Sequence, residues 1–553
     1  VNTVIEVDRL TLQAGGTLDG AGTFRVARSF TWTGGTMAGA GNTTLVLGAS
    51  GLVDANVTSA RAIINYGRLA IEQRRTLTMA GVELSNYGEL ELRRGSTLAS
   101  TGAAQLVNVW DGLFLRGEVY ARTAGGFASI AVAMENRGAI SVESGSLDID
   151  STFTNFGNGS ILVAANCRFR LNAAGFTQSF IAGSSISGVG TVVLSGGLTR
   201  IEENAMLSVS RLEILMGSQL GGSGILTAGS CEWSGGVLKD NITVQINAGS
   251  TMSIEAGANP PLLMIDSAVI INRGVIHFAG NGALQMSANA RIVNDGVANE
   301  GIFQIESTAN ILEDEENAIQ NTRVEIVNGG VLEVMPTARD NLIEASLINL
   351  QGTLQLNGRD LSLFKSYAPI SGDTMLGGGT LTCINGFTQT GGLTSLQGGS
   401  LSVTTLILVN DAQLVLDGGQ VSGTSVSIGQ TAQVIGGGLI VANVLNDGLV
   451  SISYGGLFSL SELQVTGNYT QLANGVLNVR VTGTQSGDYL NVAGVATLGG
   501  DLLITLDGTF VPGDTCNVLE YEGLQGSFAQ VYDVTQLLPW QIQWGDQIAS
   551  LYL

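Results

Sequence analysis

The sequence predicts an all-β protein built as a parallel β-helix, in which short strands stack coil upon coil. Residues 65–77 read NYGRLAIEQRRTL and residues 86–98 read NYGELELRRGSTL, so one phrase returns after 21 residues. A repeat of this length indicates a solenoid. The chain also has 78 glycines and six prolines among 553 residues. Glycine-rich turns with little proline suit a sheet in which nearly every backbone N–H bonds to a neighbouring strand.

The two copies of the phrase predict strands that lie side by side. Their apolar positions keep a two-residue period, which places them on one face of a strand. Their charged positions carry opposite signs in the two copies, as expected for strands about 4.8 Å apart. The predicted core pairs are Leu69 with Leu90 and Ile71 with Leu92, and the predicted surface pairs are Arg68 with Glu89 and Glu72 with Arg93.

The pattern Asn-x-Gly followed by an aliphatic residue recurs along the chain and predicts corners between strands. Glycine, and to a lesser degree asparagine, tolerates the positive φ of a tight corner, and stacked asparagine side chains can bond along a column of turns. No sustained helical periodicity is present, which argues against leucine-rich repeats. About 26 coils of ~21 residues would fit the chain. The recurrences begin at Asn136, Asn272, Asn299 and Asn446, with a looser copy at Asn108.

A longer-range echo supports a single solenoid. The segments FTWTGG, CEWSGG and FTQTGG end at Gly35, Gly236 and Gly392. Trp32 and Trp233 within them could form a sugar-stacking platform, but a tryptophan packed at a corner explains the pattern as well and is favoured.

Charge and hydropathy exclude two classes of partner. The formal net charge is −22, and lysine occurs only at Lys239 and Lys365. Such a polyanion lacks the basic patch that nucleic acid or an anionic lipid surface requires. Apolar runs are short and interrupted, as by Asp266 within residues 262–271, and none reaches the ~18 residues of a membrane span. We therefore expect no nucleic-acid partner and no membrane insertion.

The most specific motif lies between Gly467 and Phe528. It reads DYLNVAGVATLGGDL, then VPGD, then a final Gly-x-Phe, and it resembles the C-terminal end of autotransporter passenger domains. The upstream Asn-x-Gly repeats resemble the β-helix of filamentous haemagglutinins. The resemblance implies a right-handed parallel β-helix over residues 1–465, closed by a β-rich capping region over residues 466–553. The residues that match are Asp488, Leu490, Val492, Gly494, Ala496, Leu498, Gly500 and Leu502.

The residues favour binding over catalysis. His277 is the single histidine, so a Ser-His-Asp triad or a multi-histidine metal site would depend on it alone. Asp148 and Asp150 share a strand face at ~7 Å, the spacing of some glycosidase carboxylates, but an ordinary solvated face is the simpler interpretation. The acidic run EDEEN at residues 313–317 could attract calcium, yet a charged loop is favoured. We expect no enzyme activity, no catalytic residue, no cofactor and no metal site.

The predicted function is a structural or adhesive rod, and the resemblance implies that it is secreted or held at the outer face of a Gram-negative-type bacterium. Its expected partners are copies of itself, or glycans or proteins of a cell surface or matrix. Two alternatives remain open: a subunit of an extracellular filament or sheath, and a polysaccharide lyase or glycoside hydrolase on a β-helix. Val1 starts directly in an alternating segment, so the N-terminal end is the expected joint to upstream sequence or to another subunit.

The four cysteines are expected to be free thiols. Cys167, Cys231 and Cys383 alternate with apolar neighbours or replace one, which predicts buried positions. A buried cysteine commonly acts as a small hydrophobe. Cys167 and Cys231 are about three coils apart, or roughly 14 Å along the axis, whereas a disulfide needs Cα atoms within ~7 Å. Cys516 lies in the terminal region, where the repeat does not define which face of the strand it occupies.

Overall fold

The structure of the chain, a computed structural model, consists of β-strands joined by turns and bends, and no helix occurs among the residues that it describes. The strands form parallel stacked coils, about 22 turns in all. The predicted all-β parallel solenoid is therefore confirmed, with fewer coils than expected because several are longer than 21 residues. The described residues are 3–257, 263–296, 301–306, 310–313, 325–335, 341–452, 461–511, 513–534 and 540–552.

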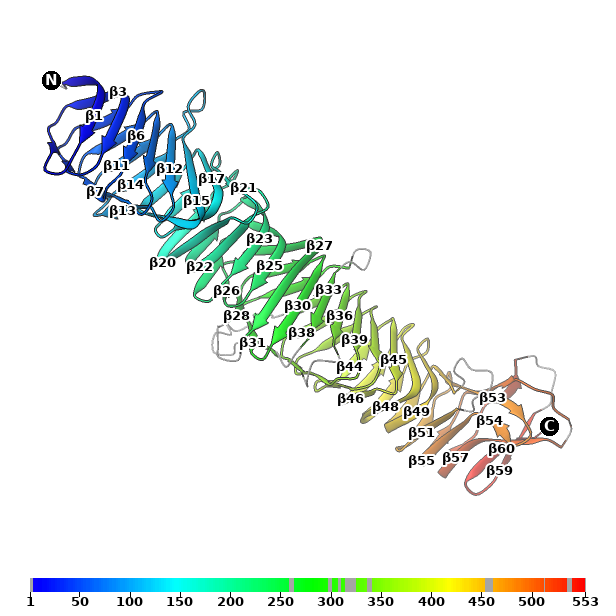
Figure 1. The fold of residues 1–553 in the computed structure, drawn as a ribbon. Helices are drawn as coiled ribbons and strands as arrows, with labels where there is room; N and C mark the ends of the chain where they lie inside the picture. Colours follow the sequence, from blue (N-terminus) through cyan, green and yellow to red (C-terminus); the bar gives the residue numbers. More distant parts are fainter. Residues whose placement is uncertain are drawn as a thin grey trace. The chain divides into compact units, whose positions relative to one another are not determined.

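The chain divides into two compact units, Val1–Ile271 and Asn272–Leu553. Within the first unit, coloured blue to green in Figure 1, successive coils follow the order of the sequence. Its early strands include β1 (Val4–Leu12), β3 (Thr23–Trp32), β5 (Asn42–Leu45), β6 (Ser50–Val53) and β7 (Val57–Ser59). Its later strands include β16 (Ala133–Asn136), β17 (Ala139–Ile149), β18 (Phe153–Asn155), β20 (Arg168–Phe180), β22 (Thr191–Ile201), β25 (Ile225–Trp233) and β27 (Thr243–Ala256).

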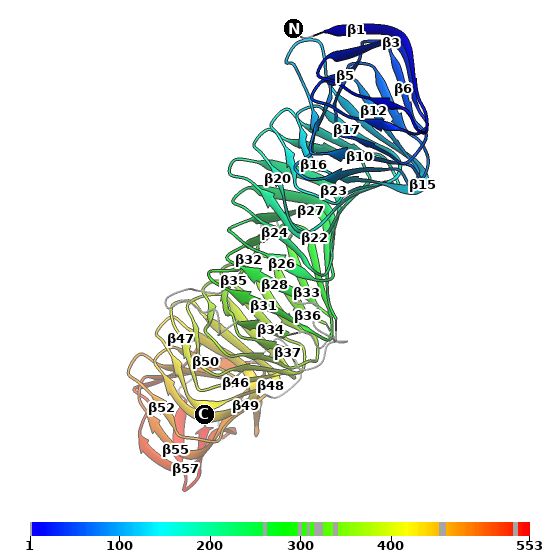
Figure 2. The ribbon, with the colours of Figure 1, turned by 90° about the vertical axis from the view of Figure 1, so that its left-hand side faces the viewer.

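The repeated phrase forms two neighbouring coils of three short strands each. In the first, β8 (Ala62–Asn65), β9 (Arg68–Ile71) and β10 (Thr76–Ala80) follow one another, and in the next β11 (Glu83–Asn86), β12 (Glu89–Arg93) and β13 (Thr97–Thr101). The third coil adds β14 (Gln105–Asn108) and β15 (Glu118–Ala131). Corresponding strands pair in parallel from coil to coil, and several of them are visible in the side view of Figure 2.

The predicted register of the phrase is confirmed. The four apolar residues are fully buried, and the charged residues pair across the coils. Arg68 Nε lies 3.9 Å from Glu89 Oε2, and Arg93 forms a salt bridge with Glu72. Glu91 lies between these pairs and receives hydrogen bonds from both arginines. Burial alone would raise the pKa of Glu91, but the bonds from Arg68 and Arg93 outweigh it and lower the pKa.

The asparagines of the corners form the predicted ladder inside the first unit. The Nδ2 group of each donates to the Oδ1 atom of the next, and all are fully buried. Each bond satisfies an amide that would otherwise be costly to bury. The distances are 2.7 Å from Asn65 to Asn86, 2.8 Å from Asn86 to Asn108, 2.7 Å from Asn108 to Asn136 and 2.6 Å from Asn136 to Asn155.

The glycines of these corners are required for a different reason from the one predicted. Gly67 and Gly88 are not among the residues with positive φ. Instead, a Cβ atom at Gly67 would lie 2.2 Å from the Ala49 carbonyl oxygen, and one at Gly88 would lie 2.0 Å from that of Gly67. The corners of successive coils approach so closely that no side chain fits, so the expectation of positive φ was wrong at these positions.

The second unit repeats this design. It contains three columns of short parallel strands and a second asparagine ladder. In this ladder the side chains of Asn272, Asn294, Asn328 and Asn349 are hydrogen-bonded one to the next. Asn299 lies outside the described residues. The strands of the columns include β30 (Val275–Gly280), β33 (Ile302–Ile305), β36 (Val331–Val334) and β39 (Thr353–Leu356), then β32 (Arg291–Asn294), β35 (Glu325–Asn328) and β38 (Ser346–Asn349), then β37 (Asn341–Ile343), β40 (Leu361–Leu363) and β43 (Thr380–Cys383).

Parallel pairing continues past residue 465, where we predicted the capping region to begin. β49 (Gln433–Asn446) pairs with β51 (Glu462–Val465), β51 with β55 (Tyr489–Leu498), and β55 with β57 (Thr515–Gly526). The pairing then turns antiparallel between β57 and β60 (Ile548–Tyr552) and between β60 and β59 (Gln541–Trp544). The division at 465 and the right-handed winding remain predictions.

The remaining core predictions are confirmed. Trp32 and Trp233 are 0% and 1% exposed, so they are packed inside the first unit and cannot meet a ligand from solvent. All four cysteines are buried and unpaired. The repeated Trp-x-Gly-Gly segments therefore contribute their tryptophans to the core and not to a ligand site.

Candidate binding groove

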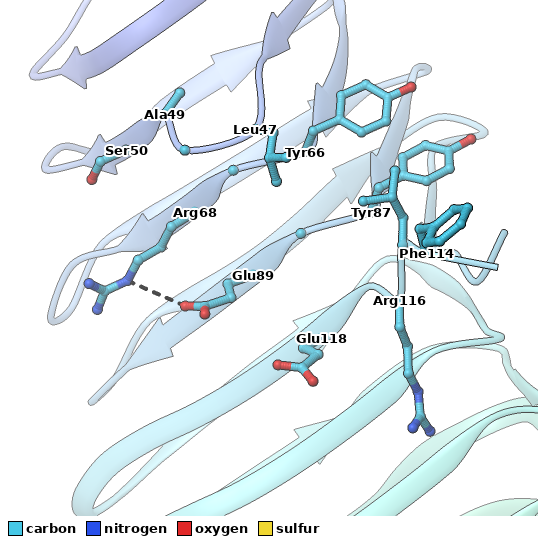
Figure 3. A pocket seen from close by; sticks show the side chains of 14 residues that line it. Leu47, Ala49, Ser50, Tyr66, Arg68, Tyr87, Glu89, Phe114, Arg116 and Glu118 are labelled. Atoms are coloured by element: carbon cyan, nitrogen blue, oxygen red, sulfur yellow. Dashed lines mark ion pairs between the residues drawn. The ribbon is translucent and has the colours of Figure 1, made fainter. Parts of the chain in front are cut away.

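An open groove lies in the first unit, where the repeated Asn-Tyr-Gly phrase meets the loop of residues 109–117. We call it the tyrosine groove. Its volume is about 620 Å³, which falls within the ~300–1,000 Å³ of typical small-ligand sites. Its lining comes from four successive coils. The principal side chains are those of Leu47, Ser50, Tyr66, Arg68, Tyr87, Glu89, Phe114, Arg116 and Glu118 (Figure 3).

Two stacked tyrosines form the aromatic part of the groove. Tyr66 and Tyr87 directly follow asparagines of the ladder. Because those asparagines point inward, both tyrosine side chains point outward. Their rings lie 4.8 Å apart between centroids, at an angle of 21°. Burial, together with the neighbouring Tyr66, Glu83 and Asp111, raises the pKa of Tyr87. Its hydroxyl is therefore protonated at neutral pH and can donate a hydrogen bond.

The loop of residues 109–117 projects a third ring beside the tyrosines. Phe114 is 90% exposed, and Leu113 beside it is 79% exposed. The loop is nevertheless well defined, because Asp111 Oδ1 accepts the backbone N–H groups of Leu113, Phe114 and Leu115 at 2.9, 2.9 and 3.0 Å. These N–H groups lower the pKa of Asp111. An antiparallel bridge between Trp110 and Arg116 closes the loop at its base.

The opposite side of the groove is polar. Figure 3 shows the ion pair of Arg68 and Glu89 on the side away from the aromatic rings, and Glu118 on the next coil beyond Glu89. Arg116 donates to the Ser160 hydroxyl, and Glu118 accepts from the Tyr120 hydroxyl. The bond to Glu118, with burial, raises the pKa of Tyr120 to about 12.

The charges that line the groove balance. Two arginines face two glutamates, so the formal charge of the lining is zero. Each group keeps spare hydrogen-bonding capacity, since a guanidinium has five N–H donors and a carboxylate about four acceptor sites. The groove thus offers apolar ring surface on one side, and hydrogen-bond donors and acceptors with capacity for a ligand on the other.

The carboxylates singled out from the sequence occupy another part of the first unit. Asp148 is less solvated than predicted, since 13% of its side chain is exposed and Arg170 Nη1 lies 3.9 Å from its Oδ2 atom. Burial raises the pKa of Asp148. Asp150 instead accepts hydrogen bonds from Ser129 at 2.6 Å and Asn172 at 3.0 Å. An unequal carboxylate pair invites comparison with a glycosidase, but neither residue lines the groove described above or the smaller one described below.

The remaining candidates lie in the second unit. His277 is on the surface of β30, with Nδ1 2.5 Å from Glu306 Oε1. Of the acidic run, Glu313 pairs with Lys365 at 2.5 Å, and residues 314–317 lie outside the described part of the chain. Among the described residues, no group of three or more histidine, cysteine, aspartate or glutamate side chains could hold a metal ion.

A second groove in the first unit is smaller and contains no charged side chain. Its volume is about 340 Å³, and serine, threonine and glycine dominate its lining. Without an exposed ring or an ion pair, it offers less to a specific ligand than the tyrosine groove. The lining includes Ser187, Ser208, Ser210, Thr227, Asn247 and Ser250.

Sequence reasoning missed the tyrosine groove although half of its signal was visible. The repeated tyrosine of the Asn-Tyr-Gly phrase indicates an exposed aromatic column once the asparagine is assigned to the interior. The looser copy at Asn108 marks the inserted loop, because 28 residues separate Asn108 from the next ladder asparagine instead of 21. Neither signal shows that Phe114 lies beside the tyrosines.

Comparisons with known proteins identify no relative of this chain, so a functional proposal depends on the fold and the groove. Among the described residues, no helix is long and apolar enough to cross a membrane. The chain matches no protein-family model, and no curated protein is significantly similar to it.

Proposed function

We propose that this chain is a structural and adhesive solenoid that presents binding surface outside a bacterial cell. The observation that carries the proposal is the stacking of parallel coils, which repeats outward-facing side chains at each turn and so builds long lateral surfaces. The tyrosine groove is a surface feature of this kind. It spans several coils and is not a deep enclosed pocket.

The surface chemistry agrees with binding outside the cell. A net charge of −22 favours solubility and disfavours attachment to nucleic acid or anionic lipid. The resemblance of residues 467–528 to the end of autotransporter passengers supports a secreted or cell-surface location. The expected partners are glycans or proteins of a surface or matrix, or further copies of this chain.

An adhesion assay tests the proposal. Beads coated with the full chain should be retained on cultured cells or on extracellular matrix more than beads coated with bovine albumin. Retention should persist at physiological salt, because the proposed contacts are not mainly ionic. Coated beads that are retained no better than the albumin control would contradict the adhesive function.

We further propose that the chain binds its partners without altering them. Neither Asp148 nor Asp150 lines either of the two grooves described above, which supports this view. Incubation with acidic and neutral polysaccharides should release no reducing ends and no unsaturated sugars. Reproducible release that is lost in Asp148→Asn or Asp150→Asn would overturn this part of the proposal.

A further inference from the structure

We propose that the tyrosine groove binds an uncharged sugar chain. This inference rests on the proposed adhesive function and names the class of partner that the groove takes. It follows from the exposed rings, the ordered loop and the balanced charges of the lining.

The rings provide the apolar surface that a sugar needs. The face of an aromatic ring carries partial negative charge, and the C–H groups on one face of a sugar ring are weakly positive. Phe114, at 90% exposure, leaves its ring open to such contact. The stacked tyrosines present ring edges and two hydroxyl groups beside it, so one ligand could meet both apolar surface and hydrogen-bonding groups.

The order of the loop reduces the cost of binding. Three backbone N–H groups bonded to Asp111 Oδ1 hold the tip that carries Phe114. A ring already held in place loses less conformational freedom when a ligand arrives, and preorganisation of this kind improves affinity. An exposed phenylalanine on an ordered loop is also costly in water, which favours an occupant.

The charges of the lining select an uncharged occupant. Arg68 is engaged by Glu89 and Glu91, and Arg116 and Glu118 bring opposite charges to the same groove. An acidic polysaccharide would meet Glu89 and Glu118, and a cationic ligand would meet Arg68 and Arg116. Sugar hydroxyls can donate to the carboxylates and accept from the guanidinium groups, so a neutral glycan uses both.

Titration calorimetry and saturation-transfer NMR on the full chain test the proposal. The neutral probes are cellohexaose, maltohexaose and chitohexaose, and the contrasting probes are hexagalacturonate, decaproline and choline. We expect at least one neutral hexasaccharide to bind, with saturation strongest on ring C–H protons. Failure of all three to bind at millimolar concentration, or preferential binding of a contrasting probe, would overturn the proposal.

Variants locate the site. Phe114→Ala and Tyr87→Ala should each weaken binding of the neutral hexasaccharide by about two- to twelvefold, the loss of one aromatic contact. Phe176→Ala is the matched control, because Phe176 is a phenylalanine of the first unit that is 48% exposed and lies outside the groove. Its affinity should equal that of the unchanged chain. If Phe114→Ala and Tyr87→Ala both bind the hexasaccharide as tightly as the unchanged chain, with the fold intact by circular dichroism, the site is refuted.

The two proposals fail separately. Bead adhesion that persists in Phe114→Ala and in excess hexasaccharide would refute the sugar groove and leave the adhesive function standing. Hexasaccharide binding in solution without bead adhesion would do the reverse.

Discussion

At the scale of single residues, a buried arginine joins several coils of the first unit. Arg61 is fully buried, and its guanidinium donates to the carbonyl oxygens of Gly20 at 2.6 Å, Asn42 at 2.9 Å and Ala38 at 3.4 Å, and also to that of Gly22. Its Nε group donates to Thr43 Oγ1 at 3.2 Å. Burial, opposed by Asp19, lowers the pKa of Arg61. The group thus joins carbonyls of three earlier segments, of which that of Gly20 also accepts the backbone N–H of Gly41.

Replacing Arg61 should loosen these coils. Arg61→Met removes the guanidinium donor from four part-buried carbonyls, so we expect a local loss of about 1–3 kcal/mol. Hydrogen exchange read by mass spectrometry should show faster exchange in peptides covering residues 36–65. Arg28→Met is the control, because the Arg28 side chain is 72% exposed and its ion pair with Asp8 spans 3.7 Å. Equal protection in the two variants would show that the Arg61 bonds contribute little.

Asp148 gives the first unit a pH dependence. Since burial raises its pKa, the native state holds the proton more tightly than the unfolded chain does. Its contribution to stability is therefore fully present below the unfolded pKa of ~3.9 and is lost as pH rises through the folded pKa.

Asp148→Asn should consequently melt at a higher temperature than the unchanged chain at pH 7, and this advantage should shrink at pH 3.5–4. Thermal melts followed by circular dichroism across this range measure it. Glu203→Gln removes the same charge from an exposed site and serves as the control. A lower melting temperature for Asp148→Asn at pH 7 would indicate that the Arg170 contact outweighs the burial of the charge.

At the scale of elements, the asparagine ladder fixes how the coils stack. Asn108 sits where the coil is lengthened, and it accepts from Asn86 at 2.8 Å, donates to Asn136 at 2.7 Å and donates to the Ala139 carbonyl at 3.0 Å. The ladder is therefore continuous across the inserted loop. Inserted residues project outward without changing the column beneath them.

Asn108→Ala should remove these bonds and take from the buried Asn136 Oδ1 atom the donor that Asn108 provides, at a cost of about 1–3 kcal/mol. Because the coil also carries Phe114, the loop should lose protection together with β14 and β15. Hydrogen exchange of peptides covering residues 105–122 measures this loss. The matched change Asn385→Ala affects an exposed asparagine that donates to one carbonyl, at 2.9 Å, and should have a much smaller effect. A ladder variant with unchanged protection would contradict the role assigned to Asn108.

The elements also show how far the sequence could lead. Two-residue alternation and charge swapping determined the register of β9 on β12, because each coil buries one face and pairs the other. The corner glycines were assigned a positive φ, since close approach between backbones is not visible in one coil alone. The position of Phe114 depended on the path of an inserted loop, and Arg61 depended on carbonyls from three earlier segments. Contacts of this kind require the full stack of coils.

At the scale of the whole molecule, the interior of each unit contains two free thiols. Cys167 and Cys231 belong to the first unit and Cys383 and Cys516 to the second, and all are buried. Burial raises the pKa of Cys231 and of Cys383 to about 12 and that of Cys516 to about 11. Since the thiolate is the reactive form, the folded chain should resist alkylation throughout.

Alkylation with iodoacetamide therefore reports on the integrity of both units at once. In the native chain at pH 8 we expect labelling of Cys231, Cys383 and Cys516 to be at least ~100-fold slower than for a free thiol with a pKa of about 8.5, and labelling of Cys167 to be slowed as well. In denaturant without reductant, all four should be labelled, because none is in a disulfide. The Arg61→Met variant serves as an internal comparison, since any increase should be confined to the first unit. A cross-linked peptide, or a native cysteine labelled at the rate of a free thiol, would contradict the buried, unpaired arrangement that the stacked coils impose.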